Sequence, residues 1–362
     1  MATSSRESKE RALEKRVADI TPEDIPEPKL NWMGRSHQWG TRVKAGKKGM
    51  TIAGLNVGYY AEVPEFWEDQ TRMPRGSMAG RGGVPPIGYS VRHKHELWAD
   101  SAGDLYEEAI QRRWIPSSDI PWESLEPLPE VVEKAMCQLC TELCQHANVE
   151  LETITSWQQQ LSYGYHEVKM YLATESFDAT RHFEVFRKRA LANGGGLGLE
   201  SRGEVNRMIL ESKGGWTETV AVLHLLRGVF THTIYRHGMK FAHNAAEREI
   251  FARCLQDKSR HLVYGLDHLK YAINHQDDQA MILEQVLAIG ERFVLREMKD
   301  PVIREALAII LGGGIEGART HGMAAYDHLM GDYFRQYLAW CDWLGLSRRR
   351  TFPEELKTYL DK

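Results

Sequence analysis

One five-residue pattern, Asp-x-[Ser/Thr]-Arg-His, occurs twice in this chain, at positions 178–182 and 257–261. Both copies lie within long stretches of helical periodicity, and apolar residues follow each of them. Positions i and i+4 of a helix share one face, so the Asp and the His of each copy can point into the same interior. Charged groups are rarely buried without partners. The two copies therefore predict a polar cluster inside a helical bundle.

Four long helical segments carry polar groups along faces that are otherwise apolar. The segments span about 129–160, 165–192, 216–243 and 245–273, and each face is found by stepping three and four residues along the sequence. The polar groups on these faces are Glu150, then Glu175 and His182, then Arg227, and finally Lys258 and His261. If the faces meet, these groups lie together in the middle of a four-helix bundle.

The remainder of the chain predicts two regions. Residues 1–95 are rich in Pro, Gly and aromatic residues and show no helical period, which indicates an extended N-terminal arm that docks either on this chain or on a partner. Residues 96–362 predict an all-α domain with additional C-terminal helices at about 278–298 and 301–344. The glycines at 312–317 fit a dinucleotide-binding pattern, but no strand is predicted before them, so we expect a break or close packing in a helix.

Composition narrows the class of protein. The chain has 362 residues, 42% of them hydrophobic, and a formal net charge of −4, as expected for a globular protein without a polyanion partner. No apolar stretch reaches the ~18 residues of a membrane helix, and the N-terminus does not resemble a signal peptide. We therefore expect a cytoplasmic protein that binds neither nucleic acid nor membrane. The five cysteines are too few for a disulfide scaffold and are expected to be buried thiols.

With these motifs in place, the chain resembles the di-iron carboxylate proteins of the ferritin-like, ribonucleotide-reductase-like superfamily, from about residue 97 to 299. It resembles the bacterial non-haem di-iron oxygenases of this superfamily in additional places. Besides the repeated pentapeptide, the resemblance rests on the stretches 105–109, 119–122, 181–186 and 194–196. It implies a ferritin-like four-helix bundle in which two helices each supply one Glu and the other two each supply Glu-x-x-His to a di-iron site.

The resemblance assigns roles to individual residues. Glu150 falls at the position of the first-helix Glu, and His182 and His261 match the two histidine ligands. Asp178 and Asp257 match the aspartates that contact the histidine ligands without binding the metal themselves.

The other ligand positions depart from the superfamily pattern. Ala179 and Lys258 occupy the positions where the carboxylates of Glu-x-x-His belong. The third-helix Glu is expected near Arg227, although the register is open by one turn and His224 is the alternative. About half of the usual di-iron ligands are thus replaced.

These replacements have a physical logic. Carboxylates left without their metal ions would repel one another in a low-dielectric interior. Two cations, Lys258 and Arg227, are instead available to the remaining carboxylates, which are Glu150, Glu175, Asp178 and Asp257. We therefore expect protein ion pairs in the space that metals would occupy, each costly to break singly.

Three functions remain open from the sequence. The first is a non-catalytic subunit whose own di-iron site is degraded and holds either no metal or iron. Such a subunit would form a homo-oligomer, or a hetero-oligomer with a metal-bearing ferritin-like paralogue. The second is an active O2-dependent iron monooxygenase in which Glu150, His182 and His261 bind a single Fe, with Glu175 or His224 completing the set. The third is a cofactor-free enzyme or small-molecule binder that uses the old active-site cavity.

Overall fold

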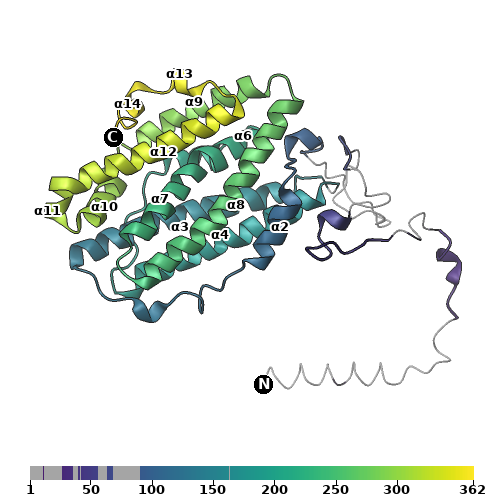
Figure 1. Ribbon diagram of the computed structural model, residues 1–362, viewed down its shortest axis with the longest axis horizontal. Helices are drawn as coiled ribbons and strands as arrows, with labels where there is room; N and C mark the ends of the chain where they lie inside the picture. Colours follow the sequence, from purple (N-terminus) through teal and green to yellow (C-terminus); the bar gives the residue numbers. More distant parts are fainter. Residues whose placement is uncertain are drawn as a thin grey trace.

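The structure is a computed structural model that describes residues 11, 27–35, 40, 42–55, 63–67, 90–162 and 164–362. Over these residues it is helical, with isolated bridges but no strand, which confirms the all-α prediction (Figure 1). None of the described helices is long and apolar enough to cross a membrane. The longer helices are α2 (Ala102–Gln111), α3 (Glu130–Gln158), α4 (His166–Ala192), α7 (Val229–Phe241), α8 (Ala245–His275), α9 (Gln279–Glu297), α10 (Pro301–Gly312) and α12 (Met323–Leu344).

Shorter elements connect these helices. They are the 3-10 turns η2 (Leu30–Trp32), η3 (Ala53–Leu55), η5 (Lys94–Glu96) and η6 (Trp122–Ser124), the helices α5 (Glu204–Leu210), α6 (Trp216–Val220), α11 (Ile315–Gly317), α13 (Arg348–Thr351) and α14 (Glu354–Lys357), and the π-helical segments η7 (Ala221–Gly228) and η8 (Ala318–Gly322).

A four-helix bundle forms the centre of the molecule. Its members are α3, α4, α8 and the continuous run α6–η7–α7, with α3 packed along α4 and α7 along α8 (Figure 1). The predicted segments match these helices closely. The exception is a change of helix type within the third one, where the π-helical segment η7 closes wider i→i+5 turns.

The C-terminal helices cover one side of the bundle. Helix α12 contacts α7 and α8, while α9 contacts η7 and α5, and α10 contacts α3 (Figure 1). Three aromatic side chains of α12, Tyr333, Phe334 and Tyr337, are almost fully buried in this layer. The end of α9 consequently lies beside the third bundle helix.

The prediction of one helix over 301–344 is wrong, and the glycines explain why. Asp300 caps α10 through the Val302 N–H (3.0 Å), but α10 ends where Gly313 and Gly314 adopt φ values of +72° and +142°. The backbone then folds back so closely that a Cβ on Gly317 would lie 1.8 Å from the Gly312 oxygen. The predicted break and close packing at these glycines is confirmed.

Parts of the predicted N-terminal arm contact the helical domain. The Ile52 N–H donates to Glu107 of α2 (2.7 Å), and the Tyr165 hydroxyl, just before α4, donates to the Arg92 carbonyl (2.6 Å). Much of the segment 1–95 lies outside the described residues, so its division from 96–362 stays a prediction.

Candidate functional site

The inner faces of α3, α4, η7 and α8 bring together a set of ionisable side chains that we call the central cluster. None of them is more than 3% exposed. Its members are Glu150, Glu175, Asp178, Arg181, His182, His224, Asp257, Lys258, Arg260 and His261. The four polar faces predicted from the sequence thus meet inside the bundle.

Lys258 forms a buried ion pair with Glu150 in the central cluster. Its Nζ lies 2.7 and 2.6 Å from the two carboxylate oxygens of Glu150, so one ammonium group is shared by both oxygens. His261 lies beside this pair, with Nδ1 2.9 Å from Glu150 Oε1 and Nε2 3.1 Å from Asp178 Oδ2. Both ring nitrogens of His261 face carboxylate oxygens, which is the arrangement that a protonated imidazolium satisfies.

The protonation state of His261 agrees with this geometry. Burial opposes the charged form, but the neighbouring Glu175 and Glu150 outweigh burial and raise the pKa of His261 to about 9. Burial likewise opposes ionisation of Glu150, yet Lys258 and His261 hold the pKa of Glu150 well below its usual value.

The two copies of the repeated motif exchange partners across the bundle. His182 Nε2 lies 3.2 Å from the Asp257 carboxylate, just as His261 contacts Asp178, so each aspartate holds the histidine of the other helix. Arg260 bridges Asp178 (3.0 Å) and Asp257 (2.5 Å), and Arg181 contacts the same two carboxylates.

Asp257 has a further donor that the motif does not contain. The indole Nε1 of Trp114 donates to Asp257 Oδ2 at 2.7 Å, while Arg181 donates to the Trp114 carbonyl (2.9 Å). Burial would raise the pKa of Asp257, but the His182 hydrogen bond and the two arginines keep it below its usual value.

The third bundle helix contributes His224 and not Arg227. His224 Nε2 lies 2.7 Å from Glu175 Oε1, and the ring fits because Gly265 faces it: a Cβ there would lie 2.4 Å from His224 Cβ. Arg227 points elsewhere and donates to both oxygens of Glu297 on α9 (2.8 and 2.7 Å). The expectation that Arg227 pairs with the bundle carboxylates is therefore not met. In the wider π turns, residues three apart diverge more than in an α-helix.

The formal charges of the central cluster balance without a metal ion. Four carboxylates (Glu150, Glu175, Asp178, Asp257) face four cations (Arg181, Lys258, Arg260 and protonated His261). The Lys258 ammonium also takes both oxygens of the one carboxylate at a first-helix ligand position, and Ala179 offers no donor atom. The residues present therefore do not fit a two-metal carboxylate site.

A pH dependence of stability follows from His261. Its pKa is about 9 in the folded chain against an ordinary 6.5, so its contribution is complete below pH 6.5 and is lost as the pH rises through 9. The shift corresponds to about 3 kcal/mol of unfolding free energy. Denaturant unfolding at several pH values should show this loss, and the His261→Gln variant should lack it. An NMR titration in which the His261 ring is neutral at pH 7 would contradict the assignment.

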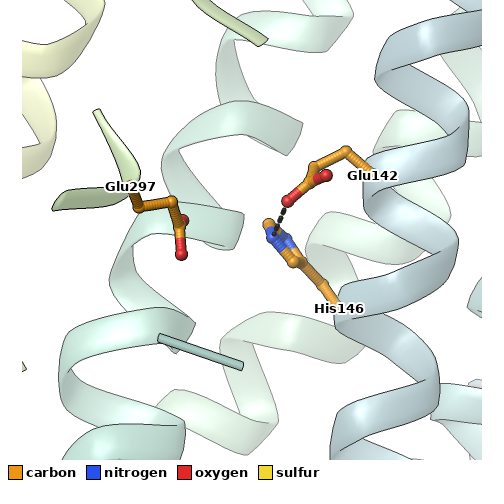
Figure 2. Close-up of side chains that lie close together, drawn as sticks. All are labelled: Glu142, His146 and Glu297. Carbon is orange, nitrogen blue, oxygen red and sulfur yellow. Dashed lines mark hydrogen bonds and ion pairs between the residues drawn. The ribbon is translucent and has the colours of Figure 1, made fainter. Parts of the chain in front are cut away.

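A second group of ligand-type side chains lies outside the central cluster, where α3, η7 and α9 meet. Glu142, His146 and Glu297 place donor atoms within 4.8 Å of one another, and Figure 2 shows Glu297 opposite the other two. Burial would raise the pKa of Glu142, but the His146 hydrogen bond lowers it to about 2. Burial and the Arg227 charge lower the pKa of His146.

Several of these residues were missed from the sequence. Arg181 and Arg260 are part of the repeated motif, but an i, i+4 pattern gives no sign of contacts between helices. Glu142 and His146 do have the i, i+4 spacing, and that was the available signal; Glu297 lies on a helix outside the bundle.

Known protein families and curated proteins give no sequence match to this chain. Solved structures do resemble it. The R2-like ligand-binding oxidase with an aerobically reconstituted Mn/Fe cofactor is 19% identical, has a TM-score of 0.55, and matches 69% of this chain and 94% of its own length. A variant of that oxidase with an Fe/Fe cofactor is 18% identical, has a TM-score of 0.54, and matches 69% and 95%. The bundle of this chain therefore has the ferritin-like fold of the R2-like ligand-binding oxidases.

Proposed function

We propose that this chain is a non-catalytic subunit of a non-haem oxygenase-type complex, in which a metal-bearing ferritin-like paralogue carries the chemistry. The observation that carries the proposal is the Lys258 ammonium group held by both oxygens of Glu150. In a di-metal carboxylate protein these oxygens face a metal ion. Here a covalently attached cation takes that position.

The charge balance supports a remodelled site. A divalent metal ion entering a neutral cluster would leave uncompensated positive charge in a low-dielectric interior, unless Lys258 or His261 released a proton. The ion pairs, in contrast, allow the bundle to keep its buried carboxylates without any metal. Such pairs contribute little net stability, but each is costly to break on its own. The chain could then serve as a stable surface for a partner.

A second candidate function is supported by a different observation. Glu150, Glu175 and His261 have ligand atoms within 4.8 Å of one another, which is a carboxylate-rich set for a single iron in an oxygenase. His182 is not in this group, because its Nε2 faces Asp257. Binding by this set requires Lys258 to leave Glu150.

Restoring the missing carboxylates tests the remodelled site. The variant Ala179→Glu/His224→Glu/Lys258→Glu should bind about two more Fe(II) or Mn(II) ions per chain than the wild type. Positions 150, 179, 224 and 258 would then carry the four ligand Glu residues, beside the two ligand His residues, His182 and His261. Metal content after gel filtration and the absorption that develops on exposure to O2 are the measurements. The matched control is Ala179→Gln/His224→Gln/Lys258→Gln, which has the same size without the charge and should gain no metal.

A different measurement, O2 consumption by the wild-type chain, tests the second candidate function. If the wild-type chain alone consumes O2 with bound iron, and Glu150→Gln abolishes both the iron and the turnover, the chain is an enzyme and not a subunit without chemistry.

The subunit role has its own test. Co-expression with a ferritin-like chain encoded beside it, with two intact Glu-x-x-His motifs, should give a hetero-oligomer by native mass spectrometry. Oxidation by that complex should survive His261→Gln in this chain and be lost when the partner's Glu-x-x-His is changed. Separate elution of the two chains, with full activity of the partner alone, would contradict the proposal.

A further inference from the structure

The group formed by Glu142, His146 and Glu297 has the features of a binding site, and we call it the lateral site. Glu142 and His146 are one turn apart on α3, and His146 Nε2 lies 3.2 Å from Glu142 Oε1. Glu297, at the C-terminal end of α9, faces them from across a gap (Figure 2). Both α3 side chains are at most 4% exposed.

Hydrogen bonds from two other residues hold the Glu297 carboxylate in position. Arg227 donates to both of its oxygens, and the Val205 N–H donates to Oε2 at 3.0 Å. Carboxylates that bind metals are commonly oriented by hydrogen bonds of this kind, which lower the cost of arranging the ligand. Oε2 of Glu297 accepts two of these hydrogen bonds, whereas Oε1 accepts one and keeps a lone pair for a further partner.

Glu142 provides the independent sign that a ligand is missing. Its Oε2 has no hydrogen-bond partner within 3.5 Å among the described residues, although the residue is only 3% exposed, and the Ser201 hydroxyl approaches Glu142 closely enough to lower its pKa. Buried carboxylate oxygens almost always have a donor or a cation beside them. A cavity of about 50 Å³ borders Glu142, Arg227 and Glu297, which is room for more than one water molecule.

We propose that the lateral site binds one divalent transition-metal ion through Glu142, His146 and Glu297, with water from the cavity completing its coordination. One imidazole nitrogen and two carboxylates form a ligand set that suits Mn(II), Fe(II) or Zn(II) better than Mg(II) or Ca(II), which prefer oxygen ligands alone.

The carboxylates of the central cluster and of the lateral site are compensated differently. The central cluster is balanced by its own cations, whereas in the lateral site Arg227 forms an ion pair with Glu297 and none with Glu142. Further charges border the cavity, namely Asp300 and the side chains of Arg202, Arg296 and Arg304. These arginines moderate the affinity for a cation and make an anion the competing occupant.

Metal titration of the full chain tests the proposal. After removal of metals with a chelator, calorimetric titration with Mn(II) and the visible absorption of added Co(II) should both report one ion per chain. Glu142→Gln and His146→Gln should each weaken binding by about tenfold or more. The ion should also raise the melting temperature of the wild type, by mass action, and not that of these variants.

Matched variants of the central cluster make the result specific. Glu150→Gln and His261→Gln change the same residue types and should leave the affinity for Mn(II) within about twofold of the wild type, provided that circular dichroism shows them folded. If binding instead disappears with Glu150→Gln, the ion is in the central cluster, and both this inference and the remodelled-site proposal fail. If the wild type binds no Mn(II), Co(II) or Zn(II), or binds inorganic phosphate at the cavity, only this inference fails.

Discussion

Lys258→Met is expected to lower the free energy of unfolding by about 3–5 kcal/mol, the usual cost of leaving one member of a buried ion pair without its partner. Glu150 would keep only the hydrogen bond from His261, while its carboxylate stays 3% exposed. Methionine has nearly the shape of the lysine stem, so lost packing contributes little. Urea unfolding of wild type and variant at pH 7, in the presence of a chelator, is the measurement.

The double variant separates charge from packing. Lys258→Met/Glu150→Leu removes both charges and should recover most of the loss, because hydrophobic replacements of buried ion pairs are often neutral or stabilising. A Lys258→Met protein as stable as the wild type would mean that Glu150 carries no charge to be compensated. The interpretation of Lys258 as a substitute cation would then be wrong.

Asp257→Ala is expected to have an effect of the same size, about 3–5 kcal/mol, for a related reason. Asp257 accepts from Arg181, Arg260, His182 and Trp114, and its loss leaves two buried guanidinium groups with Asp178 as their one shared carboxylate. Burial without a full set of partners is costly for each donor. Thermal and urea unfolding would both show the loss.

An exposed aspartate provides the control for this substitution. Asp104 on α2 pairs with Lys48 at 3.2 Å, and both side chains are about 70% exposed. Asp104→Ala should therefore cost less than about 1 kcal/mol. Comparable losses from Asp104→Ala and Asp257→Ala would show that the exchanged pairs between the two motifs do not stabilise the bundle.

The helices of the bundle could be predicted because periodicity reports burial directly. Apolar residues at steps of three and four marked the inner face of each segment, and the polar exceptions, Glu150 and Lys258 among them, lie where those faces meet. This pattern, together with the breaks between the segments, was sufficient to predict the helical bundle.

The pairing inside the bundle was harder to predict, because sequence spacing describes one helix at a time. The i, i+4 rule places Asp178 and His182 on one face, but it does not say that His182 contacts Asp257 from the neighbouring helix. The α-helical period also misplaced Arg227, since the segment that carries it is π-helical. Nothing in the local sequence separates these two helix types, so the side that each residue faces came from the structure.

The π-helical segment has a consequence for how the two buried groups behave together. Ala221–Gly228 supplies His224 to the central cluster and Arg227 to the lateral site, so one stretch of backbone carries a side chain to each. A rotation of this stretch that moves one of these residues must move the other. Metal binding at the lateral site is then thermodynamically linked to how His224 sits against Glu175 in the central cluster.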